Sequence, residues 1–313
     1  MYTYSTTPRH DWVDYCKNNN AFIHSAEWQS VLESAFNCKA VYSWNPDTNS
    51  GLTITVFKAG PFKIGYLGFP TGNFPDLHTI TMDTVHELCA GPSALMPHCL
   101  RIPVSAFTND SALDYPGQSQ PETAILDLQD WELASVSKKL RRDLKKVQKA
   151  GFQIHKTETP SDGRTLFNIY QATVKSHGGS LRYNARYFTS LIALSAHNPN
   201  VLCLTALKGG KLAGFLVVCM HMYSAYYLHG GTAPEFRRQS PSDLLVHQAI
   251  EWSKKVGAHQ FNLMTSPRSQ PSLVRYKEKW GAETREHKTL TVPLNRPFYA
   301  AFKVAEKLHR FLR

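Results

Sequence analysis

The sequence lacks the patterns that place a chain in a membrane or around a metal ion. Its 313 residues contain no apolar run of 18, and the first residues do not join a basic stretch to an apolar one, so neither a membrane-spanning helix nor a secretory signal is expected. The six cysteines are scattered without a C-x-x-C pair, and the 14 histidines show no ligand spacing. We therefore expect reduced thiols, a cytoplasmic location and no metal site.

Acidic residues are scarce relative to basic ones. Lys and Arg number 35 against 24 Asp and Glu, which gives a formal charge of +11 at pH 7. Hydrophobic residues make up 42% of the chain, so it is long and apolar enough for one large or two medium globular domains. The charge suits an acidic partner, such as tRNA, a nucleotide-linked substrate, coenzyme A or an anionic membrane surface.

The positive charge is concentrated in residues 135–150. Apolar residues recur there at helical spacing and predict one narrow buried stripe, ended by Gly151. Seven cations surround the stripe, opposed only by Asp143, and like charges four residues apart repel unless an anion screens them. This helix is predicted to contact phosphate or nucleic acid, with a solvated charged face as the alternative. The candidate contacts are Lys138, Arg142, Lys145 and Lys149.

A second anion-binding pattern lies between Tyr227 and Trp252, where a strand runs through two arginines into a helix. Ser240 occupies the N-cap position, Pro241 fits the first helical position, and Asp243 can close a capping box. A helix N-terminus presents free backbone N–H groups and partial positive charge, which favours a phosphate. The alternative is an ordinary joint with solvated arginines. The candidate phosphate-binding residues are Arg237, Arg238, Ser240 and Ser242.

The order of predicted elements indicates an α/β fold with mixed sheets. After Gly151 we expect strand, helix, helix, three strands, helix, strand, helix and strand. The polar, turn-rich segment 107–122 suits an interdomain connection. The predicted parts are therefore 1–120, 121–295 and an amphipathic helix at 296–313, which docks on the protein or, alternatively, lies on a membrane surface.

This order resembles the GNAT acyltransferase superfamily and, within it, the Fem-type branch, in which two GNAT-like domains are fused. The resemblance implies a partly degenerate first domain and a catalytic second one. Four segments carry it, and the last is similar to the branch's F-K-x-x-F-G-A motif. They are HSAEW (24–28), RRDLKKVQKAGFQI (141–154), LTALKGGKLAGFLVV (204–218) and LVRYKEKWGAE (273–283).

The resemblance implies transfer of an acyl group to an amine. Fem-type relatives use aminoacyl-tRNA, whereas others use acyl-CoA and hold its pyrophosphate with a [QR]-x-x-G-x-[GA] loop. Here Ser240 and Ser242 replace the small residues of that loop, and Pro241 removes one N–H. We therefore favour aminoacyl-tRNA as co-substrate, no permanently bound cofactor, and a peptide or small amine as acceptor, with no DNA partner. The alternatives are an acyl-CoA-dependent N-acyltransferase and a non-catalytic RNA- or peptide-binding relative.

The resemblance also assigns the catalytic residues. Lys277, at the motif lysine, would stabilise the oxyanion or a donor phosphate; alternatively it is a solvated helix lysine. Tyr276 would pack beside the donor and relay a proton, or simply belong to the core. His229, before two glycines, would be the general base if one is used, with a buried structural histidine as the alternative. The candidate acceptor-side residues are Arg182 and Tyr183.

Overall fold

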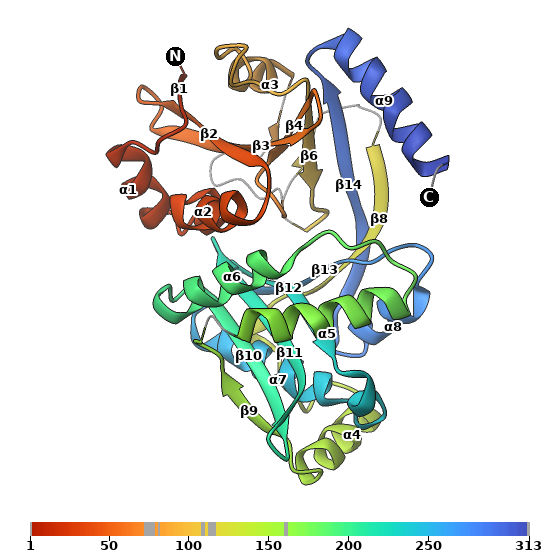
Figure 1. The fold of residues 1–313 in the computed structure, drawn as a ribbon. Coiled ribbons are helices and arrows are strands. Elements are labelled where there is room, and N and C mark those ends of the chain that lie inside the picture. Colours follow the sequence, from red (N-terminus) through yellow and green to blue (C-terminus); the bar gives the residue numbers. More distant parts are fainter. Residues whose placement is uncertain are drawn as a thin grey trace. The chain divides into compact units, whose positions relative to one another are not determined.

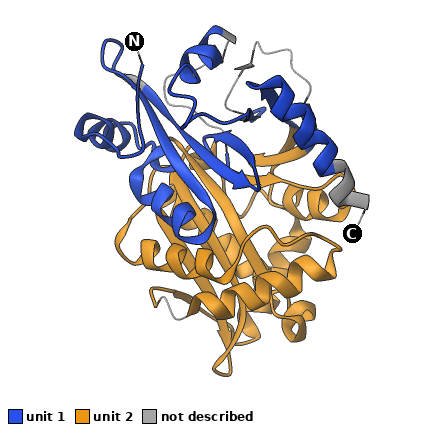
Figure 2. Ribbon diagram, turned by 45° about the horizontal axis from the view of Figure 1, so that its top comes forward, with its two compact units in different colours: residues 1–120, 286–313 blue, residues 121–285 orange. Residues whose placement is uncertain are grey.

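The computed structural model describes residues 2–71, 79–80, 82–107, 110–111, 117–159 and 162–311. The chain forms two compact units: unit 1 contains 1–120 and 286–313, and unit 2 contains 121–285 (Figure 2). The expected boundaries lie after residues 120 and 295, whereas the structure assigns 286–295 and the C-terminal helix to unit 1.

Unit 1 is built on a largely antiparallel sheet with the strand order β1-β2-β3-β4-β6-β14, in which only β4 and β6 run parallel (Figure 1). Apolar side chains from alternate strand positions form its core, Leu52, Ile54, Leu100 and Ile102 among them. The strands are β1 (Thr3–Ser5), β2 (Cys38–Asn45), β3 (Ser50–Ala59), β4 (Phe62–Leu67), β6 (Cys99–Val104) and β14 (Glu283–Pro293); β5 (Thr79–Ile80) and β7 (Asp110–Ser111) form a separate pair.

The helices of unit 1 differ most from the expected elements. Helix α1 (His10–Asn18) is not foreseen by the sequence, and α3 (Met82–Leu88) is a helix of only seven residues. Helix α2 (Ala26–Ala35) begins where HSAEW predicts, because the Ser25 hydroxyl accepts the N–H of Trp28 at 3.3 Å. A 3-10 turn, η1 (Phe22–His24), precedes it.

The C-terminal helix α9 (Arg296–Phe311) packs on unit 1 through its aromatic residues. Phe298 stacks on His98 with ring centroids 4.2 Å apart, and Phe302 meets the Phe62 ring edge-on at 5.4 Å. The predicted amphipathic helix 296–313 is thus in contact with the protein through two apolar residues; its last two residues lie outside the described ones. Contact of this helix with a membrane surface stays a prediction. Within the described ranges, no helix is long and apolar enough to cross a bilayer.

Unit 2 follows the predicted order of elements. Its sheet has the order β8-β13-β12-β11-β10-β9, with β12 and β13 parallel and the other neighbours antiparallel. Part of the expected connection 107–122 is strand, since β8 starts at residue 117; residues 108–109 and 112–116 lie outside the described residues. The strands are β8 (Gly117–Ile125), β9 (Gln153–Lys156), β10 (Val201–Lys208), β11 (Lys211–His221), β12 (Ser224–Thr232) and β13 (Gln260–Thr265).

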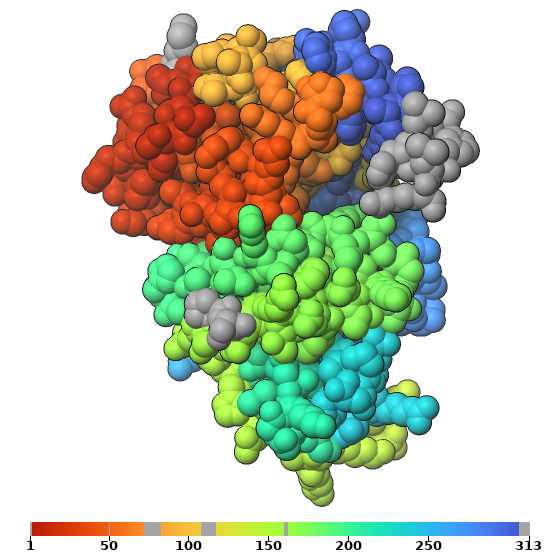
Figure 3. Space-filling view, viewed as in Figure 1, coloured from red at the N-terminus to blue at the C-terminus, as the bar shows by residue number. Residues whose placement is uncertain are grey.

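Helices cover both faces of this sheet. Strand β11 is buried without interruption from residue 213 to 221, which requires cover on each side. Helices α5 and α6 lie on the face seen in Figures 1 and 3, and α7 packs on β10, β11 and β12 from behind. The helices are α4 (Lys138–Lys149), α5 (Gly163–Ser176), α6 (Ala185–His197), α7 (Pro241–Lys255) and α8 (Pro271–Glu278), with 3-10 turns η2 (Leu128–Asp130) and η4 (Pro234–Gln239).

Candidate functional site

The two parallel strands at the centre of unit 2 part at their carboxyl ends. The register between β12 and β13 runs from Ser224 opposite Gln260 to Tyr226 opposite Asn262 and stops there, although both strands continue. Strand β12 also has a bulge against β11 at Leu228. A bulge bends a strand, and beyond Tyr226 the backbone of β12 is no longer in register with β13.

Lys277, on α8, is buried beside the end of β13. Its side chain is inaccessible, and its Nζ donates to the carbonyl oxygens of Met264 at 2.8 Å and Thr265 at 3.0 Å. Burial lowers the pKa of the Lys277 amine to about 7, and the carboxylate of Glu122 opposes that shift. Lys277 is therefore not a solvated helix lysine, and two of its three N–H groups already have acceptors.

A buried polar network holds this end of β13. The Oε1 of Glu122 accepts from the side-chain amide of Asn262 at 2.9 Å, and the Oδ1 of Asn262 accepts the N–H of Met264 at 2.7 Å. Met264 has a φ of +65°, a left-handed conformation that costs free energy for a residue other than glycine. The contacts from Asn262 and Lys277 on either side of the Met264 peptide stabilise this turn.

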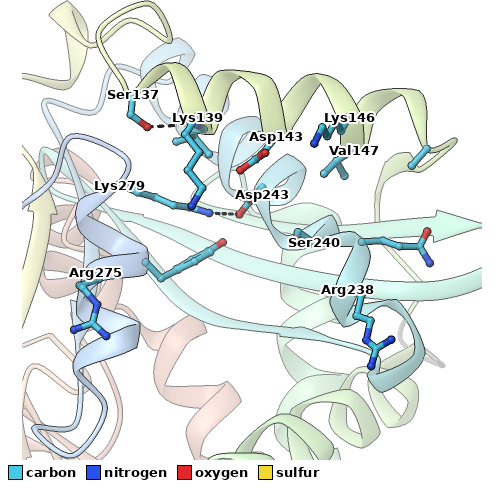
Figure 4. Close-up of a pocket in the computed structure, with 14 residues that line it drawn as sticks. Ser137, Lys139, Asp143, Lys146, Val147, Arg238, Ser240, Asp243, Arg275 and Lys279 are labelled. Atoms are coloured by element: carbon cyan, nitrogen blue, oxygen red, sulfur yellow. Dashed lines mark hydrogen bonds and ion pairs between the residues drawn. The ribbon is translucent and has the colours of Figure 1, made fainter.

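A pocket of about 660 Å³ lies next to these elements, between α4, α8 and the start of α7 (Figure 4). Five cationic side chains and two carboxylates line it, so its lining carries an excess of positive charge. The charged lining residues are Lys139, Lys146, Arg238, Arg275, Lys279, Asp143 and Asp243.

Only one face of α4 contributes to the pocket. Ser137 caps this helix by accepting the N–H of Leu140 at 3.2 Å, so α4 begins at residue 138, not at the expected 135. Leu140 and Val147 are buried, and Lys139 and Lys146 extend beside them into the pocket (Figure 4). The four predicted phosphate contacts are exposed and do not line the pocket: Lys138, Arg142, Lys145 and Lys149.

The start of α7 differs from a phosphate-binding helix terminus. Ser240 is the N-cap and Pro241 the first helical residue, as predicted, but Ser240 is left-handed (φ +52°) and its side chain makes no capping bond. The N–H of Asp243 donates to the Ser240 carbonyl at 3.0 Å, and the carboxylate of Asp243 pairs with Lys279 at 2.7 Å. The expected side-chain capping box is therefore not formed, because Asp243 is engaged elsewhere.

The two arginines before α7 have different surroundings. The Arg237 guanidinium donates to the carbonyl of Ala172 on α5 at 3.1 Å, whereas Arg238 lines the pocket. Tyr276 also lines the pocket, with the Lys279 ammonium 4.1 Å from its ring centroid. Burial raises the pKa of the Tyr276 phenol well above its ordinary value, and Asp243 adds to the effect, so the phenol keeps its proton.

His229 lies in an aromatic cluster between β12, α5 and α6. Its Nε2 is 2.9 Å from the Tyr187 hydroxyl, and the ring of Tyr183 lies edge-on at 4.4 Å. Burial lowers the pKa of His229 to about 3, so the imidazole is neutral. Of the acceptor-side candidates, Tyr183 contacts His229, and Arg182 is exposed with its backbone N–H donating to Tyr170.

Sequence reasoning named three residues that line the pocket, Arg238, Ser240 and Tyr276, but missed the two lysines that α4 contributes. Lys139 and Lys146 are seven residues apart, and each directly precedes a buried apolar residue, Leu140 or Val147. This position next to the apolar stripe is the sequence signal that distinguishes the two lysines from the outer cations. Asp243 and Lys279 carry no such signal, because 36 residues separate the two members of their ion pair.

The Acetyltransferase (GNAT) domain family matches residues 134–299, more than half of the chain. The chain belongs to this family, and it is an acyltransferase. No curated protein matches its sequence.

Solved structures share the fold over nearly the whole chain. FemX aligns with a TM-score of 0.63 and 12% identity, covering 91% of this chain and 97% of FemX. The C-terminal domain of a putative lysylphosphatidylglycerol synthetase from Agrobacterium fabrum aligns at 0.59 and 16%, covering 95% and 96%. A tandem GNAT protein from the clavulanic acid biosynthesis pathway aligns at 0.54 and 12%, covering 93% and 98%. The predicted α/β fold of tandem GNAT-like domains is confirmed.

Proposed function

We propose that this acyltransferase moves an aminoacyl group from aminoacyl-tRNA to the amine of a peptide or small molecule and forms an amide. One observation carries the choice of donor: the pyrophosphate cradle expected for coenzyme A is absent at the start of α7, while the adjacent pocket is strongly basic. Within the first three helical residues, Pro241 has no N–H and that of Asp243 is bonded to Ser240. A cationic pocket without that cradle suits the separate phosphates of an RNA end.

The proposed reaction uses two neighbouring side chains of α8: Lys277 beside the end of β13 and Tyr276 in the basic pocket. The acceptor amine attacks the ester carbonyl of the aminoacyl group, and a tetrahedral oxyanion forms. The remaining N–H of Lys277, in its charged form, donates to that oxyanion. As the carbon–oxygen ester bond breaks, the protonated Tyr276 phenol gives its proton to the leaving ribose oxygen and recovers one from the acceptor ammonium.

His229 takes a positioning role in this scheme. A general base works best when its pKa lies near the operating pH and its nitrogen faces the reacting group. The His229 imidazole, with a pKa of about 3 and its Nε2 bonded to Tyr187, meets neither condition. We assign it to holding Tyr187 and Tyr183 in place, and we place the acceptor against Tyr183 and the exposed Arg182.

One neighbouring structure supports an aminoacyl donor by its name. The Agrobacterium fabrum domain comes from a protein named a putative lysylphosphatidylglycerol synthetase, whose named product contains a lysyl group, and it shares this fold across almost the entire chain. Because a tRNA-linked donor belongs to the interior of the cell, the proposal places the reaction in the cytoplasm.

Acyl-CoA is the second candidate donor. It is favoured by the family itself, which is described as acetyltransferase. It is also favoured by the opening between β12 and β13, where several residues of each strand are not paired with the other strand. A donor bound there by its acyl arm alone would not need the pyrophosphate cradle.

A transfer assay separates the two donors. The purified protein is incubated with amine acceptors and either radiolabelled aminoacyl-tRNA or radiolabelled acetyl-CoA, and amide products are separated and counted. The proposal predicts label transfer from aminoacyl-tRNA that is lost on ribonuclease treatment. Transfer from acetyl-CoA without RNA, together with stoichiometric binding of acetyl-CoA in calorimetry, would establish the second candidate instead.

A further inference from the structure

An ion pair with a buried carboxylate lies inside the basic pocket, at the position where a phosphate would be expected. Asp243 is the third residue of α7, its side chain is only 5% exposed, and its Oδ1 is 2.7 Å from the Nζ of Lys279, the residue that follows α8 (Figure 4). A carboxylate in the first turn of a helix complements the partial positive charge of the helix N-terminus. The start of α7 is therefore already neutralised by a group of the protein itself.

The backbone at this point also has little to offer an anion. Pro241 has no N–H, and the N–H of Asp243 is bonded to the carbonyl of Ser240 at 3.0 Å. Among the first three helical residues, only Ser242 therefore has an N–H that could bind an anion. A pyrophosphate, which concentrates two to three charges in a small volume, would face the Asp243 carboxylate without a compensating cradle.

The other cations of the pocket are spread over three elements. Lys139 and Lys146 come from α4, Arg238 from the end of η4, and Arg275 from α8 (Figure 4). Separate cations match separate charges, so this arrangement suits phosphodiesters that carry one charge each.

We infer that Asp243 and Lys279 form a selectivity element that keeps pyrophosphate-bearing donors out of the pocket and leaves the remaining cations to bind the phosphodiesters of RNA. This rests on the proposed function, in that the pocket is taken as the donor's phosphate site. In the protein without a donor, Lys279 forms an ion pair with the Asp243 carboxylate. A donor phosphate would otherwise bind to this ammonium group. A pyrophosphate must break that pair and leave the carboxylate beside it, whereas an RNA end binds around it.

The test compares binding of two probes, inorganic pyrophosphate and the trinucleotide CCA, by calorimetry on the intact protein. Asp243→Asn removes the carboxylate with little change in shape. We expect its affinity for pyrophosphate to rise at least tenfold, and its affinity for CCA to change less than threefold. Asp143→Asn is the matched control, because it removes the other carboxylate of the same pocket, on α4, where the side chain is 37% exposed.

The control separates a specific effect from a general one. If both variants gain the same affinity for pyrophosphate, the pocket responds only to net charge and the inference is wrong. It is also wrong if wild-type protein binds pyrophosphate as tightly as CCA, or if Asp243→Asn leaves both affinities unchanged.

Should Asp243→Asn fail to fold, the double variant Asp243→Asn with Lys279→Gln removes both charges together, a change that buried pairs often tolerate. It is expected to lose the preference for CCA over pyrophosphate; a preserved preference contradicts the inference.

The outcomes for this inference and for the proposed function are distinguishable. Binding of the two probes requires no acyl transfer, so the selectivity is measurable whichever donor is used. If the probes behave as expected but aminoacyl-tRNA gives no product, the proposed function fails and the selectivity element stands. If transfer from aminoacyl-tRNA occurs while Asp243→Asn does not change the affinity for pyrophosphate, the proposed function stands and the selectivity element fails.

Discussion

Replacing Lys277 by Met should make the stability difference from the wild type depend on pH. The pKa of this amine falls from its ordinary 10.5 to about 7 in the folded protein, because the charged form loses its hydration. Between these two values the unfolded chain holds a proton that the folded protein has released, so wild-type stability rises with pH. Below pH 7 the wild type bears the full cost of the buried charge, about 5 kcal/mol from a shift of this size.

The magnitude over an accessible range follows from the same relation. At up to about 1.4 kcal/mol per pH unit, the unfolding free energy of the wild type should rise by about 2 kcal/mol relative to Lys277→Met between pH 7 and pH 9. The variant also leaves the carbonyls of Met264 and Thr265 without their donor, which lowers its stability by a similar amount at every pH. That loss shifts the curve and does not change its slope.

Urea unfolding at pH 7, 8 and 9, followed by fluorescence, measures this difference. Lys255→Met is the control, since Lys255 is exposed in the last turn of α7 and has no buried charge to relieve. Parallel pH curves for wild type and Lys277→Met would refute the buried, low-pKa amine.

In transfer assays, Lys277→Ala should lower the rate by about 10²–10³, the usual cost of losing one oxyanion donor. The wild-type rate should fall above pH 7, because the amine that donates must be charged.

Two further predictions concern the charged helix and the buried histidine. Charge reversal of Lys139 and Lys146 to Glu should weaken binding of a tRNA acceptor stem more, and flatten its salt dependence more, than the same reversal of Lys138 and Lys145, measured by fluorescence anisotropy at several salt concentrations; equal effects would mean that the outer face binds RNA as well. The His229 imidazole should show no titration between pH 5 and 9 in nitrogen NMR spectra, because burial holds its pKa near 3; a titration midpoint near 6.5 would contradict the closed aromatic cluster.

The fold of unit 2 could be predicted because each of its elements has a local signal. The turn at residues 208–210 joins two apolar strands, and Ser240 with Pro241 marks the start of α7, so the predicted order after Gly151 is correct. Helix α1 has no comparable signal: its N-cap position holds Arg9, and its apolar face is two aromatics and a cysteine. Its stability comes from packing, with Trp12 stacked on Tyr15 and edge-on to Trp44, and tertiary packing of this kind is not visible in a short sequence window.

The candidate site shows the same division between local and tertiary information. Lys277 and Lys279 are two residues apart, at the end of α8 and just beyond it, and sequence alone makes them equivalent apart from the motif. In the structure the first is buried against the end of β13 and the second is paired with Asp243 across the pocket, so neither is a solvated lysine. Replacing Lys279 would therefore disturb the donor pocket, whereas Lys255 leaves it intact. Lys279 is therefore unsuitable as a control position for Lys277, although the two are neighbours in the sequence. The chemistry of each lysine is set by the strand or helix that its side chain reaches.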